Sequence, residues 1–436
     1  MKNIIGIRHE DKYAMERRVA LIPGHTKGLI ENNDAEIFVQ TSAKRVFTDH
    51  EFVEAGAVLT DNLDKANVIF GVKEMPESFF QQGKTYVFFS HVIKGQPYNM
   101  PMLKKMMEMG CNLIDYEKVT DDMGRRLIFF GRFAGLAGMV NSLWSLGQRY
   151  KVKGIETPFL GIRQSHTYNS LEEAKMDVMK AGMEIAINGL PEGLSPMVIG
   201  FTGYGQVSNG AQEIANLLPS IEVTPEELLR MQSKGDFPSN VVIKVVFKEW
   251  HLSQPNDANI NFDLQHYYAH PETYHNVFEK YVPSLTILMN CMYWDERYPR
   301  IITKDFLEEL YRKGKPRLIV IADVTCDPEG SIECTHMGTH IEDPVFVYDP
   351  IKRLHTMGFE GEGILDMAVD ILPSELPREA SIAFSQALIP YVPGIIEADF
   401  RTSFESIQLP SPIKRAMILH KGKLTPDYEY IHEYIK

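Results

Sequence analysis

Short apolar runs alternate with segments of helical pattern through the first third of the chain. The apolar runs have the sequences NIIGIR, EIFVQ, NVIFGV, TYVFFSH and CNLIDYE, in this order. Between them, residues 23–32, 49–55 and 102–109 have a helical pattern. Strands that alternate with helices at this spacing predict a parallel sheet covered by helices, and therefore a first α/β domain.

A second α/β series begins with the apolar run PMVIGFT, which leads into glycines and a helical pattern, and continues through SIEV, LTILMNCMYW and RLIVIADV. Before it, residues 133–150 hold several Gly and Ala and predict a long helix that approaches its neighbours closely. Residues 225–281 are polar, acidic and rich in Tyr and His, which predicts a surface excursion. Beyond about residue 355, the pattern predicts two helices interrupted by proline. The predicted fold class is α/β, with two Rossmann-like, doubly wound parallel-sheet domains and an active-site cleft between them.

Composition narrows the function classes. The chain has 436 residues, 44% of them hydrophobic and 24% charged, as in ordinary globular proteins of two or three domains. Its 45 basic and 58 acidic residues give a net charge of −13, which argues against a nucleic-acid binder. Residues 1–150 hold 19 basic and 18 acidic residues, a net charge of +1, so the first third has relatively more cations than the rest of this acidic chain.

Cysteine usage and the apolar runs bear on the compartment. Four cysteines without a CxxC pair do not predict a disulfide framework, so a reducing environment is expected. The segment MKNIIGIRHED becomes charged after a few apolar residues, which fits a first strand better than a signal peptide. No uncharged run is long enough for a membrane span. We therefore expect a soluble cytoplasmic protein with no membrane or nucleic-acid partner, and leave homo-oligomerisation open.

The glycines after PMVIGFT predict a dinucleotide site. Gly203, Gly205 and Ser208 form GxGxxS, in which the first glycine permits a tight turn, the second lets the backbone approach a pyrophosphate, and a small third residue allows helix and strand to pack. The helix that follows directs free N–H groups at the phosphates. The cofactor-binding candidates are Gly203, Gly205, Gln206, Val207, Glu222, Thr224 and Asp323.

The choice between NAD(H) and NADP(H) depends on the strand SIEV. An acidic residue about twenty positions after the turn ordinarily holds the ribose 2′-hydroxyl of NAD, and Glu222 lies near that point. If Thr224 faces the ribose instead, no carboxylate opposes a 2′-phosphate, and Arg230 or Lys234 is near enough to assist. This favours NADP(H), with NAD(H) as the alternative.

Polar groups follow four apolar runs of the first domain, and they include Arg18, Lys73, His91, Lys94, Gln96, Glu117 and Arg126. In open parallel sheets, ligands bind at the carboxyl ends of strands, where these residues are predicted to lie. Their types suit a small polycarboxylate. Two other clusters contain side chains that can ligate a metal: His266 with His270 and His275, and Cys326 with Cys334, His336 and His340. Their spacing is irregular, so no metal is predicted.

Nine segments, in order, resemble one enzyme family. They are ERRVALIP, FGVKEMP, FFSHVIKGQ, IDYEK, FFGRFAGLAGM, FTGYGQVSNGAQEI, EVTPEEL, MNCMYW and LPREAS. Together they resemble the lysine 2-oxoglutarate reductase half of α-aminoadipic semialdehyde synthase and, more distantly, fungal lysine-forming saccharopine dehydrogenase. The wider relatives are alanine dehydrogenase and the nicotinamide nucleotide transhydrogenase domain. The resemblance runs from about residue 4 to residue 393.

The resemblance implies an enzyme that condenses L-lysine with 2-oxoglutarate and reversibly reduces the imine with NAD(P)H to saccharopine. It implies Lys73 and His91 as the acid and base, and a substrate pocket lined by Arg18, Lys94, Gln96, Glu117, Arg126 and Phe130. It also implies a substrate domain of residues 1–134 and 340–436, with a dinucleotide-binding domain of residues 135–339 inserted. The chain departs from the family in having Thr224 where animal relatives have an acidic residue, and in lacking a saccharopine-cleaving domain.

The chemistry needs residues of these types. Saccharopine carries three carboxylates, which arginines such as Arg18 and Arg126 can bind bidentately. At pH 7 only about one lysine ε-amine in 2,500 is unprotonated, a deficit of about 4.6 kcal/mol, so a positioned base such as His91 is required. Two alternatives remain: an alanine-dehydrogenase-like or opine-forming enzyme with another amine, and a catalytically idle dinucleotide-binding regulator.

Overall fold

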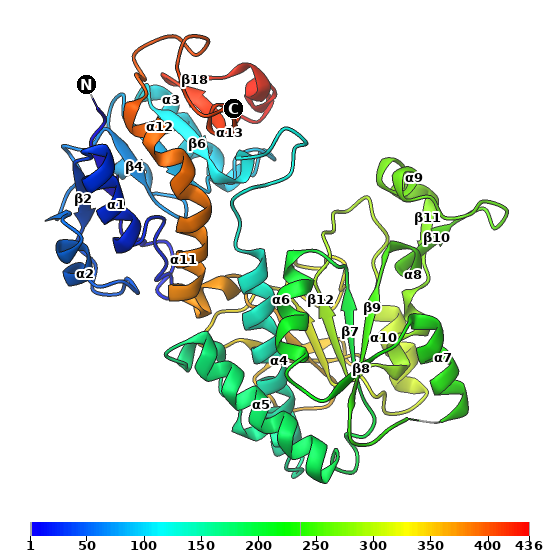
Figure 1. Ribbon diagram of the computed structural model, residues 1–436. Helices are drawn as coiled ribbons and strands as arrows, with labels where there is room; N and C mark the ends of the chain where they lie inside the picture. Colours follow the sequence, from blue (N-terminus) through cyan, green and yellow to red (C-terminus); the bar gives the residue numbers. More distant parts are fainter. Residues whose placement is uncertain (1, 236, 436) are drawn as a thin grey trace. The chain divides into compact units, whose positions relative to one another are not determined.

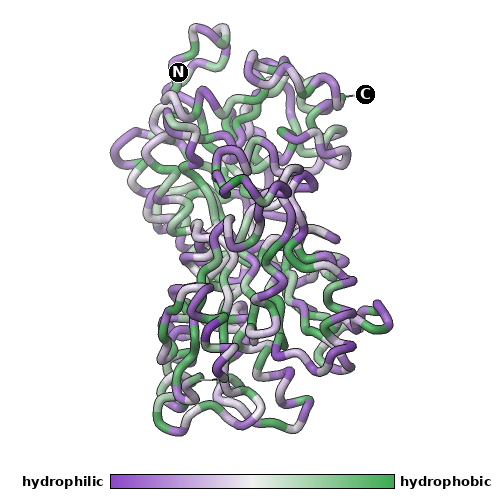
Figure 2. The backbone as a smooth tube through the Cα atoms, turned by 90° about the vertical axis from the view of Figure 1, so that its right-hand side faces the viewer, coloured by the Kyte–Doolittle hydropathy of each residue, from purple (hydrophilic) through white to green (hydrophobic). Residues whose placement is uncertain are grey.

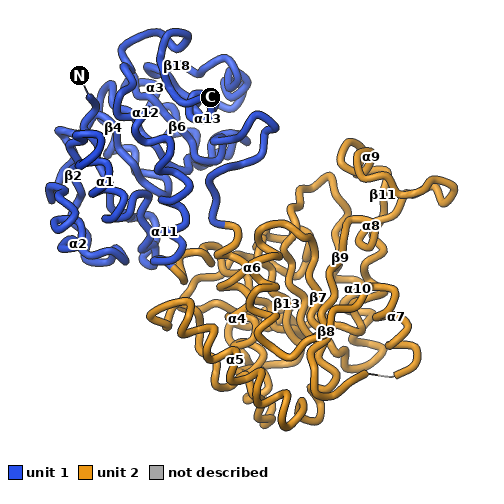
Figure 3. The backbone as a smooth tube through the Cα atoms, in the orientation of Figure 1, with its two compact units in different colours: residues 1–130, 377–436 blue, residues 131–376 orange. Residues whose placement is uncertain are grey.

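The chain folds into two compact α/β units. The computed structural model describes residues 2–235 and 237–435 (Figure 1). Unit 1 consists of Met1–Phe130 and Pro377–Lys436, and unit 2 of Gly131–Leu376 (Figure 3). Hydrophobic stretches, green in Figure 2, alternate along the chain with hydrophilic stretches, which are purple. None of the described helices is long and apolar enough to cross a membrane.

Unit 1 is built on one mostly parallel sheet with the order β18-β17-β6-β5-β4-β1-β2-β3 among the described residues. The strands are β1 (Ile5–Ile7), β2 (Ile37–Gln40), β3 (Val58–Thr60), β4 (Val68–Phe70), β5 (Thr85–Phe88), β6 (Asn112–Asp115), β17 (Met417–His420) and β18 (Lys423–Leu424). The helices are α1 (Pro23–Asn33), α2 (Asp49–Glu54), α3 (Met100–Glu108), α11 (Pro377–Leu388), α12 (Val392–Glu397) and α13 (Ser411–Arg415). Strands β1, β2, β4, β5 and β6 are buried along their whole length, as expected for a sheet covered on both faces.

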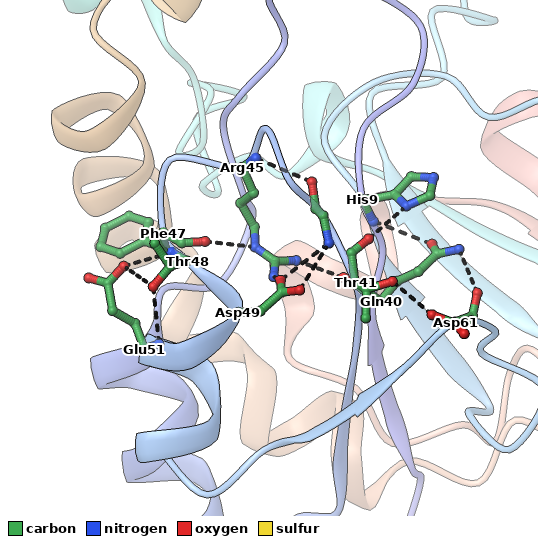
Figure 4. A network of polar contacts seen from close by, with 10 residues as sticks. His9, Gln40, Thr41, Arg45, Phe47, Thr48, Asp49, Glu51 and Asp61 are labelled. Atoms are coloured by element: carbon green, nitrogen blue, oxygen red, sulfur yellow. Dashed lines mark hydrogen bonds and ion pairs between the residues drawn. The ribbon is translucent and has the colours of Figure 1, made fainter.

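A polar network fixes the turn between β2 and α2 (Figure 4). The buried Arg45 donates hydrogen bonds to the carbonyls of Gln40 (2.9 Å) and Phe47 (3.0 Å) and pairs with Asp49. Thr48 then begins α2 with a capping box, because its side chain and that of Glu51 bind each other's backbone N–H. Arg45 is therefore a structural cation whose bonds join strand to helix.

Unit 2 contains the second sheet, with the order β15-β14-β16-β13-β12-β7-β9-β8 among the described residues. Its strands are β7 (Met197–Thr202), β8 (Ser220–Glu222), β9 (Val242–Phe247), β12 (Ile287–Asn290), β13 (Val320–Asp323), β14 (Val345–Asp349), β15 (Leu354–Met357) and β16 (Ile364–Met367); a separate hairpin pairs β10 (Ser253–Pro255) with β11 (Tyr274–Asn276). The helices are α4 (Gly131–Val152), α5 (Leu171–Asn188), α6 (Gln206–Ala215), α7 (Pro225–Lys234), α8 (Glu249–Leu252), α9 (Leu264–Ala269) and α10 (Lys304–Arg312). These two sheets confirm the predicted α/β class.

The long helix predicted from the small residues after Phe130 is α4, and it packs closely on α6. A Cβ added at Gly135 would lie 1.8 Å from the carbonyl oxygen of Val207, so only glycine allows this approach. Gly210 meets α4 from the other side, where a Cβ would lie 2.1 Å from the carbonyl oxygen of Arg132. The small residues therefore serve helix packing, as predicted.

The structure corrects two predictions about chain organisation. The family resemblance places residues 340–376 in the first domain, but β14, β15 and β16 extend the sheet of unit 2 beyond β13. The polar segment 225–281 is not wholly a surface excursion, because it contains β9, a strand inside the sheet.

The last segment nevertheless returns to the first unit. Its proline-interrupted helices α11 and α12 are present as predicted. Ser381 and Ser385 of α11 accept hydrogen bonds from the backbone N–H groups of Val19 (3.0 Å) and Ile22 (3.1 Å). These bonds dock the returning chain on the segment that follows β1.

Candidate functional site

The sheet of unit 1 changes direction between β1 and β4. From β1 the chain moves outward through β2 and β3 on one side, and β4, β5 and β6 then fill the other side. The carboxyl ends of β1 and β4 therefore lie at a topological switch point, the place where open α/β sheets bind ligands. The segments that follow β1, β4, β5 and β6 carry the predicted residues of this unit.

The first of these residues, Arg18, is buried and bound to a carboxylate. Its Nε donates to Oε1 of Glu16 at 2.8 Å and its Nη2 to Oε2 at 2.5 Å, a bidentate pair. Burial by itself would raise the pKa of Glu16, but Arg18, together with the charge of Lys73, holds it below its ordinary value. The guanidinium also lies over the ring of Phe130, 4.2 Å from the centroid. Arg18 is thus a cation of fixed position.

Lys73 follows β4, and a buried carboxylate holds its backbone. Glu10, which follows β1, accepts the N–H of Val72 at 2.7 Å and the N–H of Lys73 at 2.9 Å. Burial, and then the charge of Glu16, raises the pKa of Glu10 to about 7. The ammonium of Lys73 lies 6.0 Å from the ring centroid of Tyr13. Glu10 therefore ties the two strand ends of the switch point together.

His91 follows β5 and forms a dyad with Glu74. Its Nδ1 lies 2.7 Å from Oε1 of Glu74, which also pairs with Nζ of Lys12 at 2.7 Å. Burial opposes ionisation of Glu74, but the hydrogen bonds and charges of His91 and then Lys12 lower its pKa to about 2. Because Nδ1 faces this carboxylate, Nε2 is the ring nitrogen directed away from it, and the dyad presents that nitrogen for proton exchange.

The backbone at His91 is unusual. His91 has a left-handed φ of 49°, a conformation that a residue with a Cβ adopts only when its surroundings impose it. Asp115, buried at the end of β6, contributes to that constraint by accepting the N–H of Ser90 at 3.0 Å and that of Glu117 at 2.8 Å. One carboxylate thus positions both the His91 loop and the start of the segment after β6.

Aromatic rings connect the remaining predicted residues to the dyad. The ring centroid of Phe89 lies 6.2 Å from that of His91, with the two rings stacked, and 6.1 Å from that of Phe130. The guanidinium carbon of Arg126 lies over the Phe89 ring, 5.9 Å from its centroid. Arg126 also approaches Glu117, with 3.8 Å between Nη1 and Oε1. These contacts bring Arg18, His91, Glu117, Arg126 and Phe130 into one cluster.

Two predicted residues lie on the loop after His91. Lys94 is exposed. Gln96 is half-buried, and its Oε1 has no hydrogen-bond partner among the described residues.

Sequence reasoning predicted one carboxylate of this cluster, Glu117, but missed the other three, because it searched for cations that suit a polycarboxylate. Glu10, Glu16 and Glu74 stand within two residues of a basic residue in the same strand-end segments, as HEDK, ERR and KE. That alternation was the available signal. The structure shows that the carboxylates hold the cations and the imidazole in place.

In unit 2, the glycine turn has the geometry expected for a pyrophosphate. Gly203 has a φ of 78° and directly follows β7, and Gly205 is the N-cap of α6, whose first residues are Gln206 and Val207. A Cβ at Gly205 would meet nothing within 4 Å, so a ligand can approach the backbone there. A pocket of about 420 Å³ adjoins the turn; it is lined by Gly203, Tyr204, Gly205, Glu249, Leu252, Tyr267, Tyr268, Cys291, Met292, Tyr293 and Tyr298.

Two predicted ribose ligands serve other purposes. The side chain of Thr224 caps α7 by accepting the N–H of Glu227, and Glu222 pairs with Lys244 at 2.8 Å. Both belong to the end of the edge strand β8, which β9 separates from β7. They line a second pocket, of about 740 Å³, that shares Tyr204 with the first.

The third predicted cofactor ligand, Asp323, is fully buried at the end of β13. Its carboxylate accepts hydrogen bonds from Asn290 (2.9 Å), Thr325 (2.6 Å) and Thr335 (2.8 Å). Burial raises the pKa of Asp323. The structure thus uses this side chain to join neighbouring strand ends.

The two groups of His and Cys residues that were set aside as metal sites contact other partners. Among the described residues, no group of three or more His, Cys, Asp or Glu side chains could hold a metal ion. His266 instead contacts the hydroxyl of Tyr274 at 3.1 Å, and His336 stacks on His355 at 3.6 Å.

Comparisons with known proteins give a consistent picture. Residues 6–137 match the family model of the alanine dehydrogenase/PNT N-terminal domain. The chain is 39% identical to an alpha-aminoadipic semialdehyde synthase of Arabidopsis thaliana and 36% identical to a mitochondrial one of Bos taurus. These matches cover 98% and 99% of this chain but 41% and 48% of the relatives, so the chain spans less than half of their length.

A shorter relative is matched along most of both chains. It is a lysine-forming saccharopine dehydrogenase [NAD(+)] of Emericella nidulans, 28% identical over 89% of this chain and 91% of that protein. Among solved structures, an L-alanine dehydrogenase has a TM-score of 0.62 at 17% identity, with 99% of each chain covered. A transhydrogenase from Sinorhizobium meliloti has a TM-score of 0.51 at 15% identity, covering 97% of this chain and all of that one. These structural likenesses support the fold.

Proposed function

Because the chain is homologous along nearly its whole length to alpha-aminoadipic semialdehyde synthases and to lysine-forming saccharopine dehydrogenases, we propose that it joins L-lysine to 2-oxoglutarate and reduces the imine to saccharopine, reversibly. The similarity over 98% of the chain is the observation that carries this proposal. The cluster of acid–base and cationic groups at the switch point of unit 1 supports it. An alanine-dehydrogenase-like or opine-forming activity and an idle regulator are the alternatives.

His91 and Lys73 are the proposed acid–base pair. Imine formation requires removal of a proton from the lysine ε-ammonium and later protonation of the departing hydroxyl. In the dyad, Glu74 holds Nδ1 of His91, so Nε2 can accept the amine proton while the carboxylate stabilises the imidazolium. Lys73, whose backbone Glu10 fixes, is the second group that exchanges protons.

The proposed substrate pocket combines cations with a carboxylate. Arg18 and Arg126 bind carboxylates of the substrates, and Lys94 and Gln96 on the loop after β5 add further donors. The ring of Phe130 stacks on that of Phe384, with 4.5 Å between the ring centroids, and the guanidinium of Arg18 packs on the Phe130 ring. Glu117 binds the α-ammonium of lysine or balances the cations.

The proposed cofactor is a nicotinamide dinucleotide, which when bound supplies hydride to the imine carbon. Gly203, Gly205 and the first turn of α6 with Gln206 and Val207 fit its pyrophosphate. The sequence favoured NADP(H) because Thr224 offers no carboxylate, but Thr224 is occupied in capping α7. The hydroxyl of Thr224 is therefore not proposed as a ribose ligand.

The compartment proposed from the cysteine usage is the cytoplasm, although the bovine relative is named as mitochondrial. Immunoblotting of cell fractions tests this proposal, and recovery with an organelle fraction contradicts it.

The decisive assay compares substrates. Oxidation of NADH and of NADPH is followed with L-lysine plus 2-oxoglutarate, and with pyruvate plus ammonia. We expect a rate that depends on both lysine and 2-oxoglutarate. A rate with pyruvate and ammonia alone would establish the alanine-dehydrogenase alternative, and no rate with either pair would leave an opine-forming enzyme with another amine or the idle regulator.

Two variants test the acid–base assignment. We expect His91→Ala and Lys73→Met to lower kcat by about 10² while dinucleotide affinity is retained. His50→Ala and Lys27→Met, which alter exposed side chains of the same unit, are the matched controls. Near-normal turnover in both site variants would show that neither residue carries the proton transfers.

A further inference from the structure

Strand β7 lies between β12 and β9, so its neighbour on the side of β8 is β9, although β8 precedes β9 in the chain. Strands β7 and β9 pair in parallel from Met197 opposite Val242 to Thr202 opposite Phe247. The N–H of Gly203 donates to the carbonyl of Phe247 at 3.0 Å, so the glycine turn is hydrogen-bonded to the end of β9. In doubly wound folds, the acidic residue that holds the adenosine ribose follows the strand next to the glycine-turn strand. The residues after β9 therefore occupy that position.

Glu249 is the carboxylate in that position. It stands two residues after the end of β9 and lines the pocket that adjoins the glycine turn, together with Gly203 and Gly205. Both of its oxygens lie 3.2 Å from the hydroxyl of Tyr204, the residue between the two glycines. Oε1 also accepts the hydroxyl of Tyr268 at 2.8 Å.

The hydroxyls of Tyr204 and Tyr268 contact the Glu249 carboxylate in the way that the hydroxyls of a ribose do. A ribose offers two neighbouring hydroxyls, and a carboxylate accepts such a pair through its two oxygens. Tyr204 and Tyr268 are 45% and 43% exposed, so their hydroxyls can turn away and hydrogen-bond to water when sugar hydroxyls replace them. The tyrosines that line the rest of the pocket offer apolar ring faces for an adenine.

The charges around this position oppose a 2′-phosphate. Among the described residues that line the pocket, Glu249 is the one carboxylate, and no Lys or Arg is present. The adjoining second pocket has Lys248 against Glu226 and Glu227, while its third carboxylate, Glu222, is already paired with Lys244 at 2.8 Å. Burial lowers the pKa of its His251, which keeps that imidazole neutral at pH 7. A phosphate with a charge of about −1.5 to −2 would meet a net negative surface.

We propose that Glu249 binds the adenosine ribose of the dinucleotide and makes the protein select NAD(H) over NADP(H). This inference rests on the proposed dinucleotide binding but not on the identity of the amine or keto acid. Glu222 and Thr224, on which the sequence-based preference for NADP(H) depended, have no part in the selection.

The test measures binding in the absence of substrates, by isothermal titration calorimetry of NADH, NADPH, ADP and 2′,5′-ADP. We expect the wild type to bind NADH and ADP at least about tenfold more tightly than NADPH and 2′,5′-ADP. In Glu249→Gln, which keeps the shape and removes the charge, both ratios should fall by about tenfold. Glu222→Gln, which removes a carboxylate from the end of β8, is the matched control and should leave both ratios unchanged.

Three results would overturn the proposal: tighter binding of NADPH by the wild type, a Glu249→Gln ratio equal to the wild-type ratio, or no binding of any of the four ligands. Melting curves establish that each variant is folded. Since no amine or keto acid is present, failure of the lysine assay leaves this result unaffected. Selective NADH binding without lysine-dependent turnover would refute the proposed reaction alone.

Discussion

The sharpest consequence of the switch-point geometry concerns the carboxyl group of Glu10. Glu10 is 5% exposed and accepts two backbone N–H bonds from the end of β4, yet burial and the charge of Glu16 raise its pKa to about 7. Glu10→Gln keeps the size of the side chain and removes its titration. The variant replaces one acceptor oxygen by an amide that cannot accept, so one backbone N–H loses its partner.

The magnitudes follow from these two changes. The unpaired N–H costs about 1–3 kcal/mol at every pH. In the wild type, the folded state keeps the Glu10 proton between pH 4.5 and about 7, where the unfolded chain has lost it. The folded state then binds more protons, so the free energy of unfolding falls as pH rises through this range, by about 3 kcal/mol in total. In Glu10→Gln, which has no titrating group at this position, the free energy of unfolding does not fall for this reason as pH rises.

The prediction is therefore a difference that changes with pH. At pH 4.5 Glu10→Gln is less stable than the wild type by about 1–3 kcal/mol, and by pH 8 the difference has moved about 3 kcal/mol in favour of the variant. Amide hydrogen exchange of peptides that cover β4, compared at equal pH, reports the stability of unit 1. Glu77→Gln, which alters an exposed carboxyl in the same unit, is the control.

A stability difference between Glu10→Gln and the wild type that stays constant from pH 4.5 to 8 would refute the reasoning. So would a difference that moves against the variant as pH rises. Either result would mean that Glu10 is ionised in the folded state throughout this range, and that the two backbone N–H groups outweigh burial.

Two further predictions concern a helix contact and the dyad. Gly135→Ala places a methyl group against the backbone carbonyl of Val207 and should destabilise unit 2 by about 3 kcal/mol or more. Gly131→Ala is the control, because its Cβ would lie 3.5 Å from the nearest neighbouring atom, and it should change the stability by less than about 1 kcal/mol. Thermal unfolding followed by Trp fluorescence compares the two variants. Glu74→Gln should be about 3 kcal/mol less stable than the wild type at pH 7, with the difference closing as pH falls from 4.5 to about 2, because the lowered pKa of Glu74 stabilises the folded state above that range. Urea unfolding at a series of acid pH values measures this, and a difference that persists at pH 2 contradicts it.

Much of the fold could be predicted from the chain because its signals are local. The apolar runs at β1, β4, β5, β6 and β7 lie where strands were expected, and the Gly-rich segment after Phe130 forms α4. Turn glycines and capping residues act within a few positions of themselves, so they can be recognised without knowledge of distant neighbours.

The site was predictable in part. The cations and the imidazole of unit 1 follow apolar strands, and the structure brings Arg18, His91 and Arg126 together around Phe89 and Phe130. Glu117, the carboxylate beside Arg126, was predicted, but Glu16 and Glu74, the partners of Arg18 and His91, were not. Which carboxylate meets which cation depends on the path of the backbone beyond each strand, since Glu10 reaches β4 from 62 residues away and Glu74 reaches the end of β5.

By itself, the sequence determined the alternation of strands and helices, the glycine turn and the types of charged group that each strand end carries. Those features are set by residues close in the chain, whose spacing of two or 3.6 fixes a local conformation. Only the tertiary structure decided that β9 and not β8 lies beside β7, that β14–β16 extend the second sheet, and that buried carboxylates hold the cations of the first. Strand order and ion pairing are long-range choices, made by whichever arrangement buries the most apolar surface while it satisfies every buried polar group.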